Sequence, residues 1–120
     1  MHKMSSWPPS DCNLNASNFH EKISSHHFVA VHFYGVWSLS DKMQSSIIEI
    51  TRKDYSDIAF FSFDIDPEDG WPISRECEVL TTPSLVFFVN GKQKGIAKGF
   101  HIRRQLQNQI TNWIRNAESK

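Results

Sequence analysis

A serine and an aspartate three residues apart, Ser38 and Asp41, open a run of helical periodicity, and a histidine, His32, lies in the apolar segment before them. A serine with a histidine base is the pair that nucleophilic hydrolysis uses. A serine followed three residues later by an acid also resembles a capping box, which satisfies backbone N–H groups at a helix start. We favour the cap, because no acid that would orient His32 and no oxyanion signature is visible. His32 is then a core histidine that either finds a partner or stays neutral.

The other candidate reactive groups are two thiols, Cys12 and Cys77. Two cysteines are too few for a disulfide framework or for a metal site built on cysteine pairs. Cys77 fits a small buried packing residue, with a regulatory thiol as the alternative, and Cys12 is expected near the surface. The adjacent histidines 26 and 27 face different directions and have no third ligand near them in sequence. We therefore expect no metal and no cofactor.

Composition narrows the class of protein further. The chain has 120 residues, 39% of them apolar, which suits one domain with one core. Thirteen basic residues balance thirteen acidic ones, so a nucleic-acid-binding function is not expected. No run of 18 apolar residues and no apolar signal segment is present, so we expect a cytoplasmic protein with no membrane partner, a monomer or weak dimer.

The order of elements predicts an α/β fold. Residues 1–11 are polar and proline-containing, and we expect a flexible tail in which Trp7 packs on the surface or anchors a partner; residues 12–120 form the domain. Apolar, β-branched and aromatic runs predict strands, and Asn90-Gly91 predicts a hairpin turn between the last two. The expected strands are 12–15, 28–34, 58–65, 84–89 and 92–98.

Apolar residues at helical spacing predict four helices around that sheet. Ser17 is expected to cap the first, which buries Phe19 and Ile23. The second runs from 38 to 53, the third from 73 to 77 and the fourth from 103 to 116. The expected buried stripes are Met43, Ile47, Ile48 and Ile50 on the second helix and Leu106, Ile110, Trp113 and Ile114 on the fourth. Strands alternating with helices indicate a central mixed sheet of four to five strands with helices on both faces.

Several short motifs occur in the same order as in one known family. They are Val-His-Phe-Tyr-Gly-Val-Trp at 31–37, Lys-Met at 42–43, Phe-Asp-Ile-Asp at 63–66, Glu-Cys-Glu-Val at 76–79, Thr-Pro-Ser-Leu-Val-Phe-Phe at 82–88, Asn-Gly-Lys at 90–92, and Gly99. Together they resemble the thioredoxin family, in its eukaryotic type, over residues 13 to 116. The loop around Gly70-Trp71-Pro72 is two residues longer than in that type.

The resemblance also shows what this chain lacks. The family reduces protein disulfides with a Cys-Gly-Pro-Cys turn, and the matching residues here are Ser38-Leu39-Ser40-Asp41. Ser38 takes the place of the nucleophile and Asp41 that of the resolving cysteine. His32 stands where the family has a buried aspartate, and Ser62 where a lysine is common. The resemblance therefore implies a thioredoxin fold without the family's catalytic residues.

The groove beside that turn is the feature that we expect to remain. In the family a cis bond precedes the proline that matches Pro83, and this exposes the backbone of Thr82 to an extended chain. With Trp37, Gly99 and Phe100, these residues would bind a protein or peptide partner by strand-like addition. The alternative is that Pro83 only shapes the entry to its strand.

Two functions follow from these observations. The first is a redox-inactive binding module for a protein or peptide, which would not be an enzyme. The second is an oxidoreductase of the same family that works through one remaining thiol, Cys77 or Cys12.

Overall fold

The computed structural model describes residues 7–9 and 12–118, and five strands form one mixed sheet in the order β1-β3-β2-β4-β5. Strands β1, β3 and β2 are parallel, and β4 and β5 continue the sheet as an antiparallel hairpin. This confirms the α/β prediction of a mixed sheet. The strands are β1 (Asn13–Leu14), β2 (Phe28–Tyr34), β3 (Ile58–Asp64), β4 (Ser84–Val89) and β5 (Lys92–Lys98).

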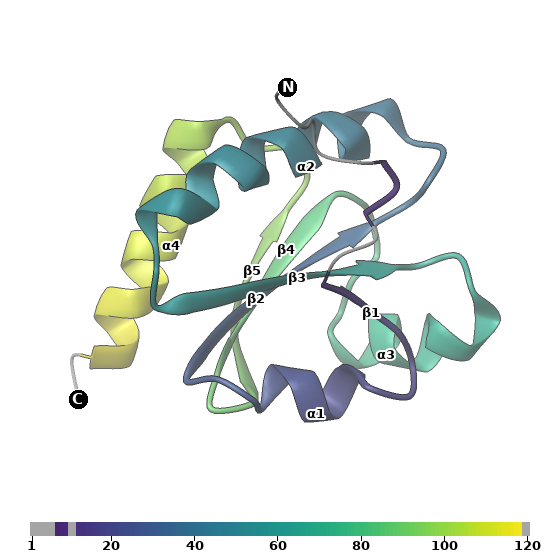
Figure 1. Cartoon of the computed structure of the whole chain (residues 1–120), viewed down its shortest axis with the longest axis horizontal. Helices are drawn as coiled ribbons and strands as arrows, with labels where there is room; N and C mark the ends of the chain where they lie inside the picture. The colour runs from purple at the N-terminus through teal and green to yellow at the C-terminus, as the bar shows by residue number, and fades with distance from the viewer. Residues whose placement is uncertain (1–6, 10–11, 119–120) are drawn as a thin grey trace, which may run out of the picture.

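Helices cover both faces of this sheet, with α1 and α3 on one face and α2 and α4 on the other (Figure 1). Two short 3₁₀ turns join them: η1 continues α2, and η2 leads into α3. The helical segments are α1 (Phe19–Ile23), α2 (Leu39–Thr51), η1 (Arg52–Asp54), η2 (Glu68–Gly70), α3 (Trp71–Glu76) and α4 (Arg103–Glu118). Among the described residues, none of these helices is long and apolar enough to cross a bilayer.

Strand β2 lies between β3 and β4, and all seven of its residues are buried. Alternate side chains enter the two cores: Val29 and Val31 face α1 and α3, while Phe28 and Ala30 face α2 and α4. A strand with helices on both faces needs apolar residues at nearly every position, which explains the unbroken run in the sequence.

Two predicted helix starts were wrong. Asn18, not Ser17, occupies the N-cap of α1, and the Asn15 side chain accepts hydrogen bonds from the backbone N–H groups of both residues, at 2.9 and 3.0 Å. An asparagine side chain readily accepts a hydrogen bond from the backbone N–H two residues later, and the turn formed in this way by Asn15 takes the place of the predicted serine cap. Helix α3 begins at Trp71 rather than residue 73, because Pro72 fits the first turn of a helix, where no N–H partner is needed.

The buried face of α2 is largely polar, and half of the predicted apolar stripe is confirmed: Ile48 is buried and Ile47 packs, partly buried, against the same core. Asp41, Gln44 and Thr51 point inward with Ile48, whereas Met43 and Ile50 are each 50% exposed. Burying a polar group costs little when hydrogen bonds replace its water. Thr51 meets this condition by donating to the Ile47 carbonyl at 2.7 Å, and Gln44 meets it near the site described below. Asp41 meets it only in part, because Oδ2 accepts a hydrogen bond whereas the buried Oδ1 has no partner among the described residues.

Helix α4 closes the second core as predicted. Leu106, Ile110 and Trp113 are buried, whereas Ile114 is only half-buried. The Trp113 indole stacks on Phe87 of β4 with ring centroids 5.3 Å apart. This packing fixes the C-terminal helix against the hairpin.

Candidate functional site

The turn that joins β2 to α2 carries the degenerate motif. Ser38 is the N-cap of α2 in extended conformation, and its Oγ accepts a hydrogen bond from the backbone N–H of Asp41 at 3.2 Å. The same Oγ lies 3.1 Å from the Ser40 hydroxyl. The predicted serine cap is confirmed, and the hydroxyl is used within the turn itself.

The carboxyl group of Asp41 has a different role from the one predicted. It is fully buried, and Oδ2 accepts a hydrogen bond from the backbone N–H of Gly35 at 2.6 Å. A capping box would require it to reach the N–H of Ser38, but that group donates to the Gly35 carbonyl at 3.2 Å. Asp41 therefore ties the first turn of α2 to the end of β2.

Three segments distant in sequence meet beside this turn. The peptide bond between Thr82 and Pro83 is cis, and the Pro83 carbonyl accepts from the N–H of Gly99 at 2.8 Å. A Cβ built on Gly35 would lie 3.5 Å from the Asp41 Oδ2 atom and 3.9 Å from the Thr82 hydroxyl oxygen. The motif turn, Thr82-Pro83 and Gly99 are thus neighbours.

Gly99 leaves open space at its place in this cluster. Its φ is +86°, a conformation that favours glycine, and a Cβ built there would meet nothing within 4 Å. The next residue, Phe100, is 40% exposed. A ligand backbone can therefore approach Gly99 closely.

Gln44 holds the loop after Gly99 in place, and sequence reasoning missed it. Its side-chain Oε1 accepts from the backbone N–H of His101 at 2.7 Å, and its Nε2 donates to the His101 carbonyl at 2.9 Å. The His101 ring lies 2.8 Å from the Gly99 carbonyl through Nδ1. A glutamine at a helical position carries no sequence signal for a partner 57 residues away.

Exposed apolar side chains occur in the motif turn, on α2 and after Gly99. Trp37 is 94% exposed, and Leu39, Met43 and Ile102 are also exposed. Large apolar side chains on a surface mark interaction sites when they gather beside one another. Such residues flank the motif turn and the loop after Gly99.

His32 lies beneath α2 in the middle of the sheet. It pairs with Ser62 on β3 and Leu85 on β4, and its ring is buried. Nε2 has no hydrogen-bond partner among the described residues, and burial lowers the pKa of His32 to about 4. His32 is therefore neutral at pH 7, as the second of the two predicted states requires.

The structure does not support a serine hydrolase. The hydrogen bonds of the Ser38 hydroxyl involve Asp41 and Ser40, and none joins it to His32. His32 lines a small cavity of about 60 Å³ together with Cys12 and Ser62 instead.

The two cysteines are free and differ in exposure. Cys77 ends α3 and is buried in the first core, and burial, with Glu76 as a smaller cause, raises the pKa of its thiol to about 12. Cys12 is exposed, and its carbonyl accepts from the N–H of Ser62 at 3.0 Å. In residues 7–9 and 12–118, no three His, Cys, Asp or Glu side chains form a metal-binding group.

Part of the predicted N-terminal tail packs against the motif turn. Trp7 lies on the ring of Tyr34, with centroids 5.2 Å apart, and its Nε1 donates to the Val36 carbonyl at 3.0 Å. This agrees with a packing role for Trp7. Residues 1–6 and 10–11 of the predicted tail lie outside the described residues.

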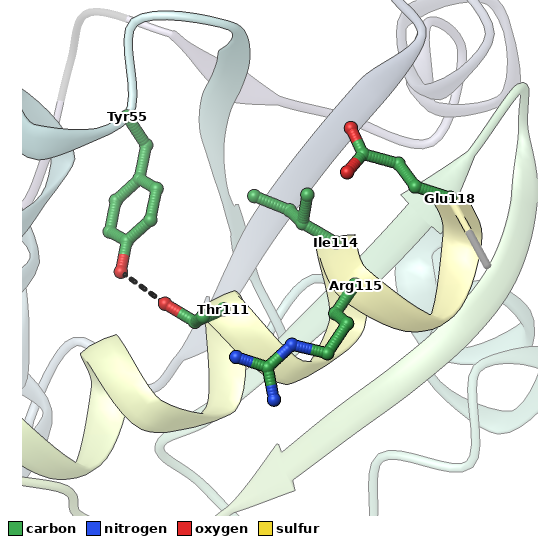
Figure 2. A pocket seen from close by; sticks show the side chains of 5 residues that line it. All are labelled: Tyr55, Thr111, Ile114, Arg115 and Glu118. Carbon is green, nitrogen blue, oxygen red and sulfur yellow. Dashed lines mark hydrogen bonds between the residues drawn. The ribbon is translucent and has the colours of Figure 1, made fainter.

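A further hollow of about 460 Å³ lies elsewhere, between the end of η1 and α4. Figure 2 shows Tyr55 directed at Thr111 of α4, with a hydroxyl-to-hydroxyl distance of 3.1 Å. The Tyr55 hydroxyl also donates to the Gln107 carbonyl at 3.2 Å. These contacts join η1 to α4, and no residue of the motif turn lines this hollow.

The sheet order, the helices on both faces and a cis proline beside the start of α2 define a thioredoxin-like domain. The family model described as Thioredoxin matches residues 11–112. The chain belongs to the thioredoxin family.

Known thioredoxins show the same similarity. The chain is 35% identical to thioredoxin-1 of Saccharomyces cerevisiae over 78 residues, 65% of this chain and 74% of the relative. It is 34% identical to thioredoxin-2 of the same yeast over 65 residues, 54% of this chain but only 61% of that relative. It is 29% identical to thioredoxin of Mycoplasmoides gallisepticum over 93 residues, 78% of this chain and 91% of the relative.

A solved thioredoxin structure is also similar to this chain. Oxidised mitochondrial thioredoxin 3 of Saccharomyces cerevisiae superposes with a TM-score of 0.74 at 26% identity, covering 83% of this chain and 92% of that one.

The cap on α2 predicts a measurable loss of stability. Ser38→Ala removes the acceptor for the Asp41 N–H, and we expect the free energy of unfolding to fall by about 1 kcal/mol in urea titration. Ser46→Ala is the matched control, because this hydroxyl makes only a 3.5 Å contact in the middle of the same helix. Equal stability of the two variants would contradict a stabilising role for the Ser38 cap.

Because His32 is neutral in the folded chain, we expect the stability of the fold to decrease in acid. The unfolded chain protonates this residue near pH 6.5 and the folded chain near pH 4, so the unfolded state binds more protons between these values. Above pH 6.5, His32 adds no pH dependence to the free energy of unfolding. As the pH falls from there to 4, protonation of His32 in the unfolded chain lowers this free energy by about 3 kcal/mol.

Urea titrations at several pH values test this dependence. We expect His32→Leu to flatten the pH dependence, whereas His26→Leu, at an exposed position, keeps it. An unchanged slope in His32→Leu would show that other groups cause the acid sensitivity.

Proposed function

We propose that this chain is a redox-inactive thioredoxin-family protein that binds an extended protein segment in the groove beside Thr82-Pro83. One observation carries the proposal. The two positions that hold the family's dithiol are Ser38 and Asp41, and both side chains serve the helix start and the turn. The segments that form the groove remain in contact around them.

The chemistry of the turn argues against thiol–disulfide exchange at Ser38. Exchange needs a thiolate that attacks a disulfide and a second thiol that resolves the mixed disulfide. A hydroxyl is far more basic than a thiol, and a helix N-terminus supplies only about 0.3–2 kcal/mol toward an anion. The turn therefore has neither a nucleophile nor a resolving group for this reaction.

The backbone around Thr82 supports binding instead. In the part of the chain that the structure describes, no backbone hydrogen bond is made by Thr82, which leaves one donor and one acceptor for an added strand. Trp37 offers an apolar wall, and Gly99 leaves room for the ligand main chain. Affinity would then come from main-chain hydrogen bonds and one aromatic contact.

The competing function is thiol chemistry at a cysteine outside the motif. Cys77 is a poor candidate, because burial keeps its thiol protonated at neutral pH. Cys12 is exposed and remains the thiol on which such a function would depend. Because the two cysteines are free, a reducing compartment is suitable, and we propose a cytoplasmic monomer or weak dimer with a protein partner.

Insulin reduction separates the two functions. We expect the parent protein to give no turnover above that of the Cys12→Ser/Cys77→Ser variant, because neither has a dithiol at the motif. Ser38→Cys/Asp41→Cys serves as the positive control at the helix start. Turnover by the parent that the double serine variant loses would overturn the redox-inactive proposal.

Trp37→Ala tests the groove. The side chain is exposed, so the fold should be retained, while capture of protein partners from a lysate should fall tenfold or more if Trp37 is a central contact. Ile50→Ala is the control, since Ile50 is an exposed apolar residue near the other end of α2. Equal recovery of the same partners by the parent protein and Trp37→Ala would refute the proposal that partners bind in this groove.

A further inference from the structure

Cys12 lies between two hollows on the side of the molecule where β1 pairs with β3. It lines the inner cavity of about 60 Å³ that His32 also lines, and an outer hollow of about 370 Å³. Arg52 and two phenylalanines of β3 line both spaces, so the inner cavity and the outer hollow are adjacent. None of the groove residues lines either of them, and this region is therefore separate from the groove.

The Cys12 side chain is exposed, whereas its main chain is fixed on the sheet. The Cys12 carbonyl accepts a hydrogen bond from the N–H of Ser62 at 3.0 Å, and the next residue begins β1. Thiol–disulfide exchange depends on access to the thiol, and Cys12 meets this condition. Cys77 does not meet it, because it is buried in the first core. Of the two cysteines, Cys12 is the one that a dissolved disulfide reaches.

The inner cavity contains a polar atom that the fold does not use. His32 is only 3% exposed, and its Nε2 has no hydrogen-bond partner among the described residues. Buried polar atoms are normally paired with protein, with water or with a ligand. A space of about 60 Å³ accommodates a small polar group, since one water needs only about 10–15 Å³. The cavity therefore offers a hydrogen bond to a group that enters beside Cys12.

The outer hollow combines basic and apolar side chains. Arg52 and His26 line it, and among the residues that the structure describes no aspartate or glutamate does so. Tyr55, Phe60 and Phe61 supply apolar walls. Its volume of about 370 Å³ lies within the range of about 300–1,000 Å³ that small-molecule sites occupy. This lining suits a small molecule that carries carboxylates.

One acid adjoins this region. Glu49 lines the inner cavity, and its Oε1 lies 3.6 Å from a guanidinium nitrogen of Arg52. Both side chains are well exposed, so the ion pair is weak. A carboxylate of a ligand can therefore compete with Glu49 for Arg52.

We propose that Cys12 is a modification site, at which the chain forms a mixed disulfide with a small thiol that carries carboxylates, as glutathione does. The Cys12 thiolate attacks one sulfur of the small-molecule disulfide, and the other half of that disulfide leaves as a thiolate. Cys12 is thereby oxidised, and the disulfide that serves as the oxidant is reduced. In the adduct a carboxylate faces Arg52, and a polar group of the ligand main chain reaches His32 in the inner cavity.

This modification is distinct from catalysis and from binding in the groove. The second thiol of the chain, Cys77, lines neither the inner cavity nor the outer hollow, so no internal group resolves the mixed disulfide. The adduct therefore persists until an external thiol reduces it. A redox-inactive protein can carry such an adduct, and the proposal holds whether or not the groove binds a partner.

Intact-protein mass spectrometry after incubation with glutathione disulfide tests the site. At about pH 8, where thiolates become available, we expect one glutathione per chain in the parent protein and in Cys77→Ser, and none in Cys12→Ser. The urea-unfolded parent, in which both thiols are accessible, shows that the reagent is active. Attachment at Cys77 in the folded chain, or no adduct in the folded parent while the unfolded chain reacts, would overturn the proposal.

Arg52→Gln tests recognition of the carboxylates. In about 50 mM salt, the rate of adduct formation with glutathione disulfide should fall about threefold to tenfold, whereas the rate with uncharged hydroxyethyl disulfide should not change. Lys53→Gln is the matched control, because Lys53 is an exposed cation of η1 that lines neither hollow. Glu49→Gln should raise the glutathione rate by removing the competing charge. An equal ratio of the two rates in the parent protein, Arg52→Gln and Lys53→Gln would overturn this recognition.

The inner cavity has a readout of its own. In NMR spectra of the imidazole nitrogens, the His32 Nε2 signal should shift when glutathione is attached, because a buried atom gains a hydrogen bond. His20, on the exposed side of α1, is the internal control and should keep its signals. An adduct at Cys12 that leaves the His32 signals unchanged would overturn the placement of the ligand in this cavity.

Discussion

The hydrogen bond from the Gly35 N–H to the buried carboxyl group of Asp41 joins the central strand to the helix that follows it. It fixes where α2 starts, and this in turn places the Ser38 cap. It also brings the turn within reach of Thr82, because Gly35 lies between the two side chains. The position of the turn that carries the exposed Trp37, relative to Thr82, depends on this contact.

The same contact explains how a turn with serine and aspartate at the motif positions keeps its shape. Ser38 and Asp41 now make local hydrogen bonds that hold the turn. A buried polar atom stabilises a structure when it is paired, as Asp41 Oδ2 is, whereas Asp41 Oδ1 has no partner among the described residues.

Periodicity predicted the sheet well, because the strands β2 and β4 are buried on both faces and clear turn residues bound the strands. The range of β2 and the hairpin at Asn90-Gly91 agree with the prediction for this reason. The predicted buried face of α2 was right for Ile47 and Ile48 but missed the polar residues, because apolar residues at helical spacing do not reveal that Gln44 finds a partner at His101. The cap of α1 was wrong because Asn15 and Ser17 are both good turn residues and only their hydrogen bonds distinguish them.

The sequence by itself determined the fold class, the absence of cysteine from the motif turn and the acidic character of the 64–78 segment. These are properties of residue type and local spacing. Only the tertiary structure decided that Asp41 is buried rather than a solvent-facing cap, and that His32 lacks a partner at Nε2 among the described residues. Each of these depends on contacts between segments far apart in the chain, and such contacts form only when the sheet and its helices pack together.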